Sequence, residues 1–238
     1  MKQLSYILLA CALCALTALP AQAQQKATNT TDRYTPKAID LGLPSGTLWA
    51  DRNMGITSSP TDFGVYYSWG SIYSSDEDDL LPYDQRGFSW RTYRFGKSAK
   101  TLTKYCTDTT FGTKDGKTQL EPDDDAATAY AKNHRTPIWD AQWHIPTAKE
   151  FEELMEKCNW TWTDGGYKVT GPNGNSIFLS AAGMAKMHLS GMGQYWTSTL
   201  CADFPCYAYA VIICDEFATW NNASRSLGLS VRPVKKKK

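Results

Sequence analysis

The 238-residue sequence predicts an α+β fold, a single domain in which two main helices lie beside many short antiparallel strands. Helical signals occur in only two segments. Short runs rich in aromatic and β-branched residues, separated by turn residues, recur through the chain and are typical of strands. No internal repeat with a period of about 20–50 residues is present, which excludes a solenoid or a propeller.

The first strands are expected from residue 38 onward. Ala38–Asp51 predicts a strand, a tight turn at Pro44-Ser45-Gly46 and a second strand, and Phe63–Gly70 predicts another short strand. The segment 71–125 has no regular pattern. It contains two acidic runs, Asp76–Asp79 and Asp123–Asp125.

Two segments predict helices. Asp125–Lys132 is rich in alanine and places negative charge at the positive end of the helix dipole. The clearer helix follows Pro146, where Thr147 and Glu150 have the spacing of a capping box. Its apolar face is formed by Phe151, Leu154, Met155 and Cys158.

The remainder of the chain predicts strands. Tyr167–Thr170 and Ser176–Leu179 flank Pro172–Asn175, and the Asn-Gly pair in this turn accepts positive φ at low cost, which is typical of a hairpin. Three further strands are expected at Tyr195–Ser198, Tyr207–Cys214 and Leu229–Arg232.

The N-terminus has the three parts of a secretory signal peptide: Lys2, an apolar run over Leu4–Leu19 and an Ala-x-Ala ending at Ala23. We expect cleavage after Ala23 and a polar linker over 24–37. The alternative, a lipoprotein signal acylated at Cys11, is disfavoured by the short apolar run before that cysteine. No later stretch reaches the roughly 20 apolar residues of a membrane helix. The protein is therefore expected to be secreted or held at the cell surface, without a transmembrane segment.

The net charge of +1 conceals a mildly acidic domain. Lys2 and the tail Lys235–Lys238 account for five of the 25 basic residues, which leaves 20 basic against 24 acidic residues and a net charge of −4. This balance excludes a dedicated nucleic-acid binder. The basic tail, 235–238, is expected to be a flexible, solubilising end.

Aromatic residues are abundant, at 13% of the chain, and several stand beside polar ones. Ring faces next to amides and hydroxyls suit a saccharide or a protein epitope. The alternative is that the rings fill the core, which we expect for Trp160, Trp162 and Trp196, whereas Trp220 lies in a polar, loop-like context. The mixed segments are Trp160-Thr161-Trp162, Tyr195-Trp196, Tyr207-Ala208-Tyr209 and Trp220-Asn221-Asn222.

A series of motifs in this order resembles the Fibrobacter succinogenes major paralogous domain (FISUMP), a family abundant in secreted proteins of Bacteroidetes. The resemblance covers residues 38–234, although His144 stands where the family usually has arginine. The motifs include Leu41–Ala50, Gly64–Gly70, Leu102–Cys106, Asp124–Ala127, Ile145-Pro146-Thr147 with Phe151–Leu154, Gly166–Thr170, Asn175–Leu179, Ala181–Gly183, Tyr195–Ser198 and Gly228–Val234.

The resemblance implies one C-type-lectin-like domain that serves as an exported, non-catalytic binding or adhesion module. In lectin-like binders the late region displays the ligand-facing residues, so the resemblance implies a surface for a glycan or protein partner here. We therefore expect ligand binding at Asp203, Tyr207, Tyr209, Asp215, Glu216, Trp220, Asn221, Asn222 and Arg225.

Two other functions remain open. Cys201 and Cys206 have a spacing similar to the copper-binding pair of formylglycine-generating enzymes, which implies an oxidase, although a local disulfide between them is the favoured interpretation. A structural subunit of a surface assembly is the other alternative. The mature chain retains five cysteines, an odd number, whose pairing the sequence leaves open: Cys106, Cys158, Cys201, Cys206 and Cys214.

No hydrolase, metalloprotease, P-loop or dinucleotide motif is present, so no catalytic residue is predicted. No metal or other cofactor is expected either. The scattered histidines and the lack of a Cys-x-x-Cys pair disfavour zinc. A calcium site at Asp123, Asp124 or Asp125 is the one exception kept open, against helix capping and solvation as the simpler interpretation.

Overall fold

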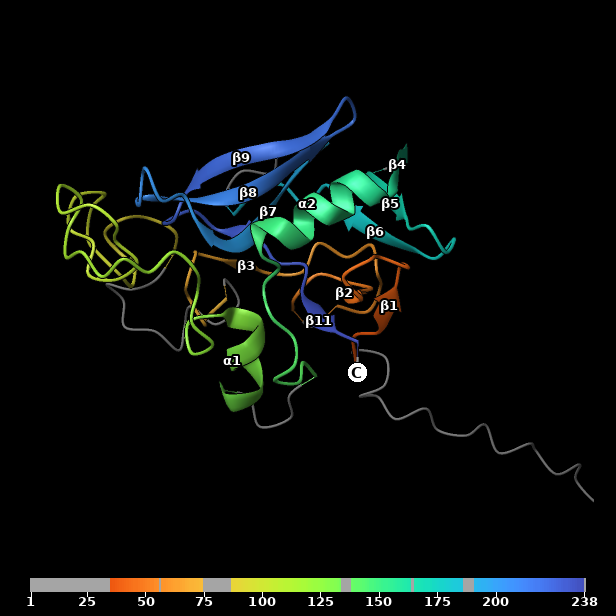
Figure 1. The fold of residues 1–238 in the computed structure, drawn as a ribbon, viewed down its shortest axis with the longest axis horizontal. Coiled ribbons are helices and arrows are strands. Elements are labelled where there is room, and N and C mark those ends of the chain that lie inside the picture. Colours follow the sequence, from red (N-terminus) through yellow and green to blue (C-terminus); the bar gives the residue numbers. More distant parts are fainter. Residues whose placement is uncertain are drawn as a thin grey trace, which may run out of the picture.

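The structure is a computed structural model that describes residues 35–55, 57–74, 87–133, 138–163, 165–185 and 191–237. The predicted signal peptide, Cys11, nearly all of the predicted linker and the first acidic run lie outside these residues. Within them the chain forms two helices and eleven strands in three sheets (Figure 1). All strand pairs but one are antiparallel, so the predicted α+β class is confirmed.

The central sheet has five strands in the order β3-β10-β7-β8-β9. Its long strands, β7 (Met192–Leu200), β8 (Tyr207–Cys214) and β9 (Ala218–Ser224), form an antiparallel meander. Two short strands complete it: β3 (Tyr66–Tyr67) and β10 (Leu229–Ser230), of which β10 runs parallel to β7. The polar segment around Trp220, expected as a loop, is therefore an edge strand.

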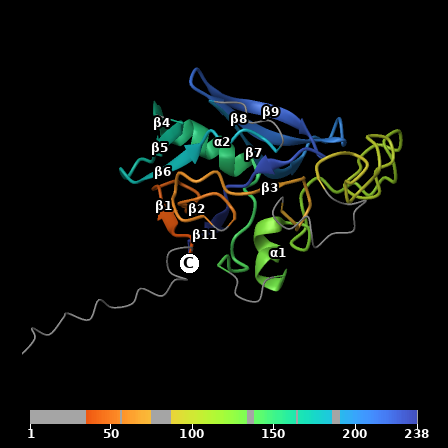
Figure 2. The ribbon, with the colours of Figure 1, turned by 180° about the vertical axis from the view of Figure 1, so that it is seen from behind.

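Side chains on the two faces of this sheet belong to two hydrophobic clusters, as the period of two along a strand requires. On one face Trp196 and Ala210 join a cluster with α1 (Ala126–Asn133) and the irregular segment 87–121. Figures 1 and 2 show that this irregular segment lies at the end of the molecule opposite the strands β4 (Asn159–Thr163), β5 (Gly166–Thr170) and β6 (Ser176–Ser180).

The other face of the central sheet is covered by α2 (Ala148–Lys157). Thr147 caps the helix and closes the predicted capping box with Glu150, and Phe151 and Leu154 are buried as expected. A second sheet, β4-β5-β6, continues this side of the core. Its strands are β4 (Asn159–Thr163), β5 (Gly166–Thr170) and β6 (Ser176–Ser180), the last two forming the predicted hairpin.

The third sheet, β1-β2-β11, corrects the prediction of a flexible tail. It contains β1 (Ala38–Asp40), β2 (Thr47–Ala50) and β11 (Val234–Lys236). Lys235 and Lys236 pair with β2, and Lys237 lies 2.7 Å from an Asp40 carboxylate oxygen. Lysines are common on sheet edges because they discourage pairing with other chains, so a basic run is compatible with a strand here.

Of the tryptophans expected in the core, only Trp196 is fully buried. Trp160 and Trp162 are half-buried on β4, where both contact the ring of Tyr167 edge-on. Neither helix is long and apolar enough to cross a membrane.

Candidate functional site

The predicted binding residues lie on or beside the β8–β9 hairpin, and four of them share one face. Tyr209 pairs with Asn222, and Trp220 pairs with Val211, two residues further along β8. Because side chains alternate along a strand, Tyr207, Tyr209, Trp220 and Asn222 all face the α2 side of the sheet. Only these four can contribute to a single surface.

The other polar candidates are separated from that face. Asn221 lies on the opposite face, where its amide nitrogen donates to Gln194 Oε1 at 3.3 Å. Asp203 is exposed in the β7–β8 connection, whereas Asp215 and Glu216 are exposed in the β8–β9 turn. The eight residues of β8 separate these two ends by roughly 25 Å.

The prediction of Arg225 as a surface residue is wrong, because its side chain is completely buried. Its Nε donates to Tyr93 Oη at 2.9 Å. Its two terminal nitrogens donate to the backbone carbonyls of Tyr105, Pro205 and Lys104 at 2.8–3.0 Å. The guanidinium also lies over three aromatic rings, with centroids 4.8–5.8 Å away. Arg225 therefore holds the irregular segment against the central sheet.

The shared face of β8 and β9 contains a pocket of about 220 Å³, here called the helix-side pocket. Tyr209 and Trp220 form one wall, with ring centroids 6.2 Å apart and planes at 73°. The first turns of α2 form the other wall. The lining residues are Ala148, Lys149, Glu152, Tyr209 and Trp220.

The helix wall is held rigidly by the sheet, while its charged groups remain available. Ala148 N donates to Thr199 Oγ1 of β7 at 3.0 Å, and the buried face of α2 packs into the core. Lys149 and Glu152 are exposed and make no hydrogen bond or ion pair with another described residue. Sequence reasoning missed both residues, because only the packing of α2 on β8 brings them beside the aromatic pair.

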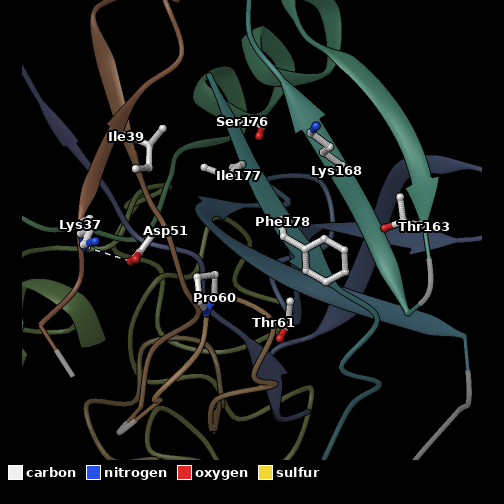
Figure 3. A pocket seen from close by; sticks show the side chains of 10 residues that line it. All are labelled: Lys37, Ile39, Asp51, Pro60, Thr61, Thr163, Lys168, Ser176, Ile177 and Phe178. Carbon is white, nitrogen blue, oxygen red and sulfur yellow. Dashed lines mark hydrogen bonds between the residues drawn. The ribbon is translucent and has the colours of Figure 1, made fainter. Parts of the chain in front are cut away.

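A larger pocket of about 460 Å³, the strand-side pocket, lies between the β1 edge and the β4-β5-β6 sheet (Figure 3). None of the predicted binding residues contributes to it. Its lining residues are Lys37, Ile39, Asp51, Pro60, Thr61, Thr163, Lys168, Ser176, Ile177 and Phe178.

The carboxylates of Asp123, Asp124 and Asp125, considered as calcium ligands, already bind other groups of the protein. Asp123 Oδ1 lies 2.6 Å from Lys132 Nζ. Asp124 accepts from the Tyr105 hydroxyl at 2.6 Å and forms ion pairs with two basic side chains. Asp125 caps α1, accepting from three backbone N–H groups, and its burial raises the pKa of the carboxyl. Among the described residues no group of three potential metal ligands is found.

The five cysteines of the predicted mature chain are described, and all are free thiols, so the favoured disulfide between Cys201 and Cys206 is not formed. Both of these thiols are buried, at 4% and 6% exposure. Burial raises the pKa of Cys206, which disfavours the thiolate that a Cu(I) ion would need.

A charged cluster links α2 to the C-terminal strand. His144 Nε2 lies 3.3 Å from both carboxylate oxygens of Glu150, and Lys236 Nζ lies 3.2 Å from Glu150 Oε1. Burial opposes ionisation of Glu150, but hydrogen bonds from His144 and Thr147 outweigh it and lower the pKa to about 2. Burial likewise opposes protonation of His144, but the hydrogen bond and charge of Glu150 raise its pKa. His144 thus helps to hold β11 in place, through Glu150 and Lys236.

Comparisons with known proteins add no assignment to this geometry. No family model matches the sequence, and no curated protein or solved structure matches it. The resemblance to the FISUMP family and to C-type-lectin-like folds therefore stays a prediction.

Proposed function

We propose that this protein is an exported, non-catalytic binding or adhesion module that holds a glycan in the helix-side pocket. The observation that carries the proposal is the aromatic pair Tyr209–Trp220 facing the free charges of Lys149 and Glu152 across a pocket. The sequence resemblance to secreted, lectin-like domains supports the same function, and the signal peptide predicted at the N-terminus supports export.

The chemistry of the pocket suits a sugar ring. Aromatic faces bind the apolar C–H face of a saccharide, while directional hydrogen bonds recognise its hydroxyls. Glu152 can accept from hydroxyls and Lys149 can donate to them, and Asn222 offers both functions on the same strand face. Because one acidic and one basic side chain line the pocket, it is matched to a neutral sugar. A volume of about 220 Å³ accommodates a single sugar residue.

A glycan array with the mature protein tests this function, followed by titration of the retained glycans. Trp220→Ala should weaken binding of a neutral glycan at least tenfold, since it removes one of the two rings of the aromatic wall. Glu216→Gln is the matched control, because Glu216 is exposed in the turn beyond the pocket. A folded wild-type protein that retains no neutral glycan contradicts the proposal, as does retention that Trp220→Ala leaves unchanged. Capture of a host protein instead of a glycan would show that the ligand of this face is a protein.

The copper-oxidase and surface-assembly hypotheses stay predictions. No contact among the described residues favours either one over a binding module.

A further inference from the structure

The outer face of the β4-β5-β6 sheet is polar, and its described residues carry no carboxylate. Trp160, Trp162, Tyr167, Val169 and Ile177 belong to the inner cluster. The residues that alternate with them therefore point outward. This outer set consists of Asn159, Thr161, Thr163, Gly166, Lys168, Thr170, Ser176, Phe178 and the fully buried Ser180. On its exposed or half-buried part, four hydroxyls, one amide, one ammonium group and one aromatic ring thus share a surface.

Phe178 lies against this surface because a glycine makes room for it. Phe178 pairs with Lys168 on β5, and Gly166 lies two residues before Lys168. A Cβ added to Gly166 would lie 2.8 Å from Phe178 Cζ, so the ring occupies the space that any other side chain would take. The half-buried ring forms one side of the strand-side pocket (Figure 3).

The walls of the strand-side pocket are fixed by buried charges. Arg232, which is completely buried, donates to the carbonyl oxygen of Phe178 at 2.7 Å. On the opposite wall Asp51 accepts from the backbone N–H of Lys37 at 2.9 Å and binds Arg52 through both carboxylate oxygens at 2.9 Å. Arg52 also donates to the carbonyl of Thr57, before the Pro60–Thr61 turn. The pocket is therefore preformed rather than created by a ligand.

The free charge at this pocket is positive. Lys37 and Lys168 stand on opposite walls, and neither ammonium group makes a hydrogen bond or ion pair with another described residue. Asp51 is the only carboxylate among the described residues of the lining, and Arg52 neutralises it. The domain as a whole has a net negative charge. Two unpaired lysines around a partly apolar cavity therefore favour an anionic ligand at this position.

We propose that the strand-side pocket binds an acidic saccharide, with the sugar ring on Phe178 and its carboxylate between Lys37 and Lys168. The hydroxyls of Thr163 and Ser176 favour a polyhydroxylated ligand over a fatty acid, whose chain would leave them without partners. The volume of about 460 Å³ accommodates more than one sugar residue. This site is separate from the helix-side pocket and selects the opposite class of glycan, charged rather than neutral.

Digalacturonate and its neutral counterpart galactobiose test the proposal, because they differ chiefly in the carboxylates. Calorimetric titration of the mature protein at low salt should detect digalacturonate, with at least tenfold weaker binding of galactobiose. Affinity should fall as salt is added. Lys168→Gln should weaken digalacturonate binding about tenfold, and Phe178→Leu should also weaken it. Lys149→Gln is the matched control, a lysine of the helix-side pocket.

Each outcome decides the proposal. Equal affinity for the two disaccharides overturns it, as does digalacturonate binding that Lys168→Gln leaves unchanged or that Lys149→Gln abolishes. Tetraglutamate binding as tightly as digalacturonate overturns the saccharide assignment and points to an acidic peptide. Since Lys168 is exposed, its replacement should not disturb folding, which near-ultraviolet circular dichroism verifies. Trp220→Ala should retain digalacturonate binding, so failure of the helix-side pocket is distinguishable from failure of this one.

Discussion

The two faces of the central sheet are covered by different kinds of structure. On one face lies the irregular segment 87–121, which contains no helix or strand and whose backbone polar groups are paired partly through turns and partly by side chains. On the other face, most backbone N–H and C=O groups of α2 and of the β4-β5-β6 sheet are paired by the regular hydrogen bonds of a helix or a sheet. Each side is nevertheless joined to the rest of the molecule by one fully buried arginine, Arg225 or Arg232.

The two arginines serve these surroundings differently. Arg225 binds three backbone carbonyls in connecting segments that are not part of any sheet. One of these belongs to Tyr105, which adopts a φ of +56° and is held by Asp115 and Asp124 as well. Arg232 instead bridges the end of β2, at Ala50, and the middle of β6, at Phe178, two strands that are already paired. An irregular region can therefore be as ordered as a sheet, but its order depends on fewer residues.

The largest effect is expected from Arg225→Met. This change leaves four buried hydrogen-bond acceptors without their donor, and we expect the free energy of unfolding to fall by about 4 kcal/mol. Denaturant titration measures the loss. Amide hydrogen exchange should accelerate more in residues 87–121 than in the β4-β5-β6 sheet. Uniform acceleration over both regions would contradict the difference drawn between them.

A smaller effect is expected from Arg232→Met. Because Arg232 is completely buried, its charge is costly to keep in the core, and burial lowers its pKa to about 10. Removing that charge offsets part of the loss of three hydrogen bonds, so we expect about 2 kcal/mol of destabilisation. Hydrogen exchange should accelerate locally around Phe178 and Ala50. A loss greater than that of Arg225→Met would reverse the comparison.

The smallest effect concerns pH, and it lies between the two regions at His144 and Glu150. The folded pKa of His144 is raised above 6.5, so its contribution is complete below pH 6.5 and is lost as the pH rises through the folded value. The pKa of Glu150 is lowered to about 2, so its contribution is present above pH 4.5 and is lost as the pH falls toward 2. This pair therefore stabilises most between about pH 4.5 and 6.5.

Thermal unfolding from pH 4 to 9 measures this dependence. His144→Gln should lower stability by about 1 kcal/mol at pH 5.5 and by less at pH 8.5. A deficit that grows with pH would show that neutral His144, rather than its charged form, is the stabilising species.

Much of the fold follows from local sequence pattern. The bounds of β8, the hairpin turn and the capping box of α2 were all predicted, because each depends on residues that are close together in the sequence. The strand β9 was missed because its asparagines and serine resemble a loop. Its strand geometry depends on pairing with β8.

The candidate sites were less predictable. Arg225 was assigned to the surface because it lies in the late region that displays ligand-facing residues in lectin-like binders. Arginines are rarely buried, and only the arrangement of carbonyls and rings around it explains the exception. Lys168 and Phe178 carry no local signal of a site, since they meet Lys37 only through contact between two sheets. Sequence pattern thus located one pocket in part and the other not at all.

The pairing of β11 with β2 also sets the order in which the molecule can fold. Lys236 lies opposite Thr47, so this contact closes a loop of nearly the whole domain, whereas the β7–β8 and β5–β6 pairs close short ones. Long-range closure carries the larger entropic barrier, and it comes late in folding. During synthesis one edge of β2 stays unpaired until β11 has been made. In that interval its apolar Leu48 and Trp49 are open to a wrong partner. Once β11 has paired, Lys235, Lys236 and Lys237 hold it in place through ion pairs with Asp140, Glu150 and Asp40.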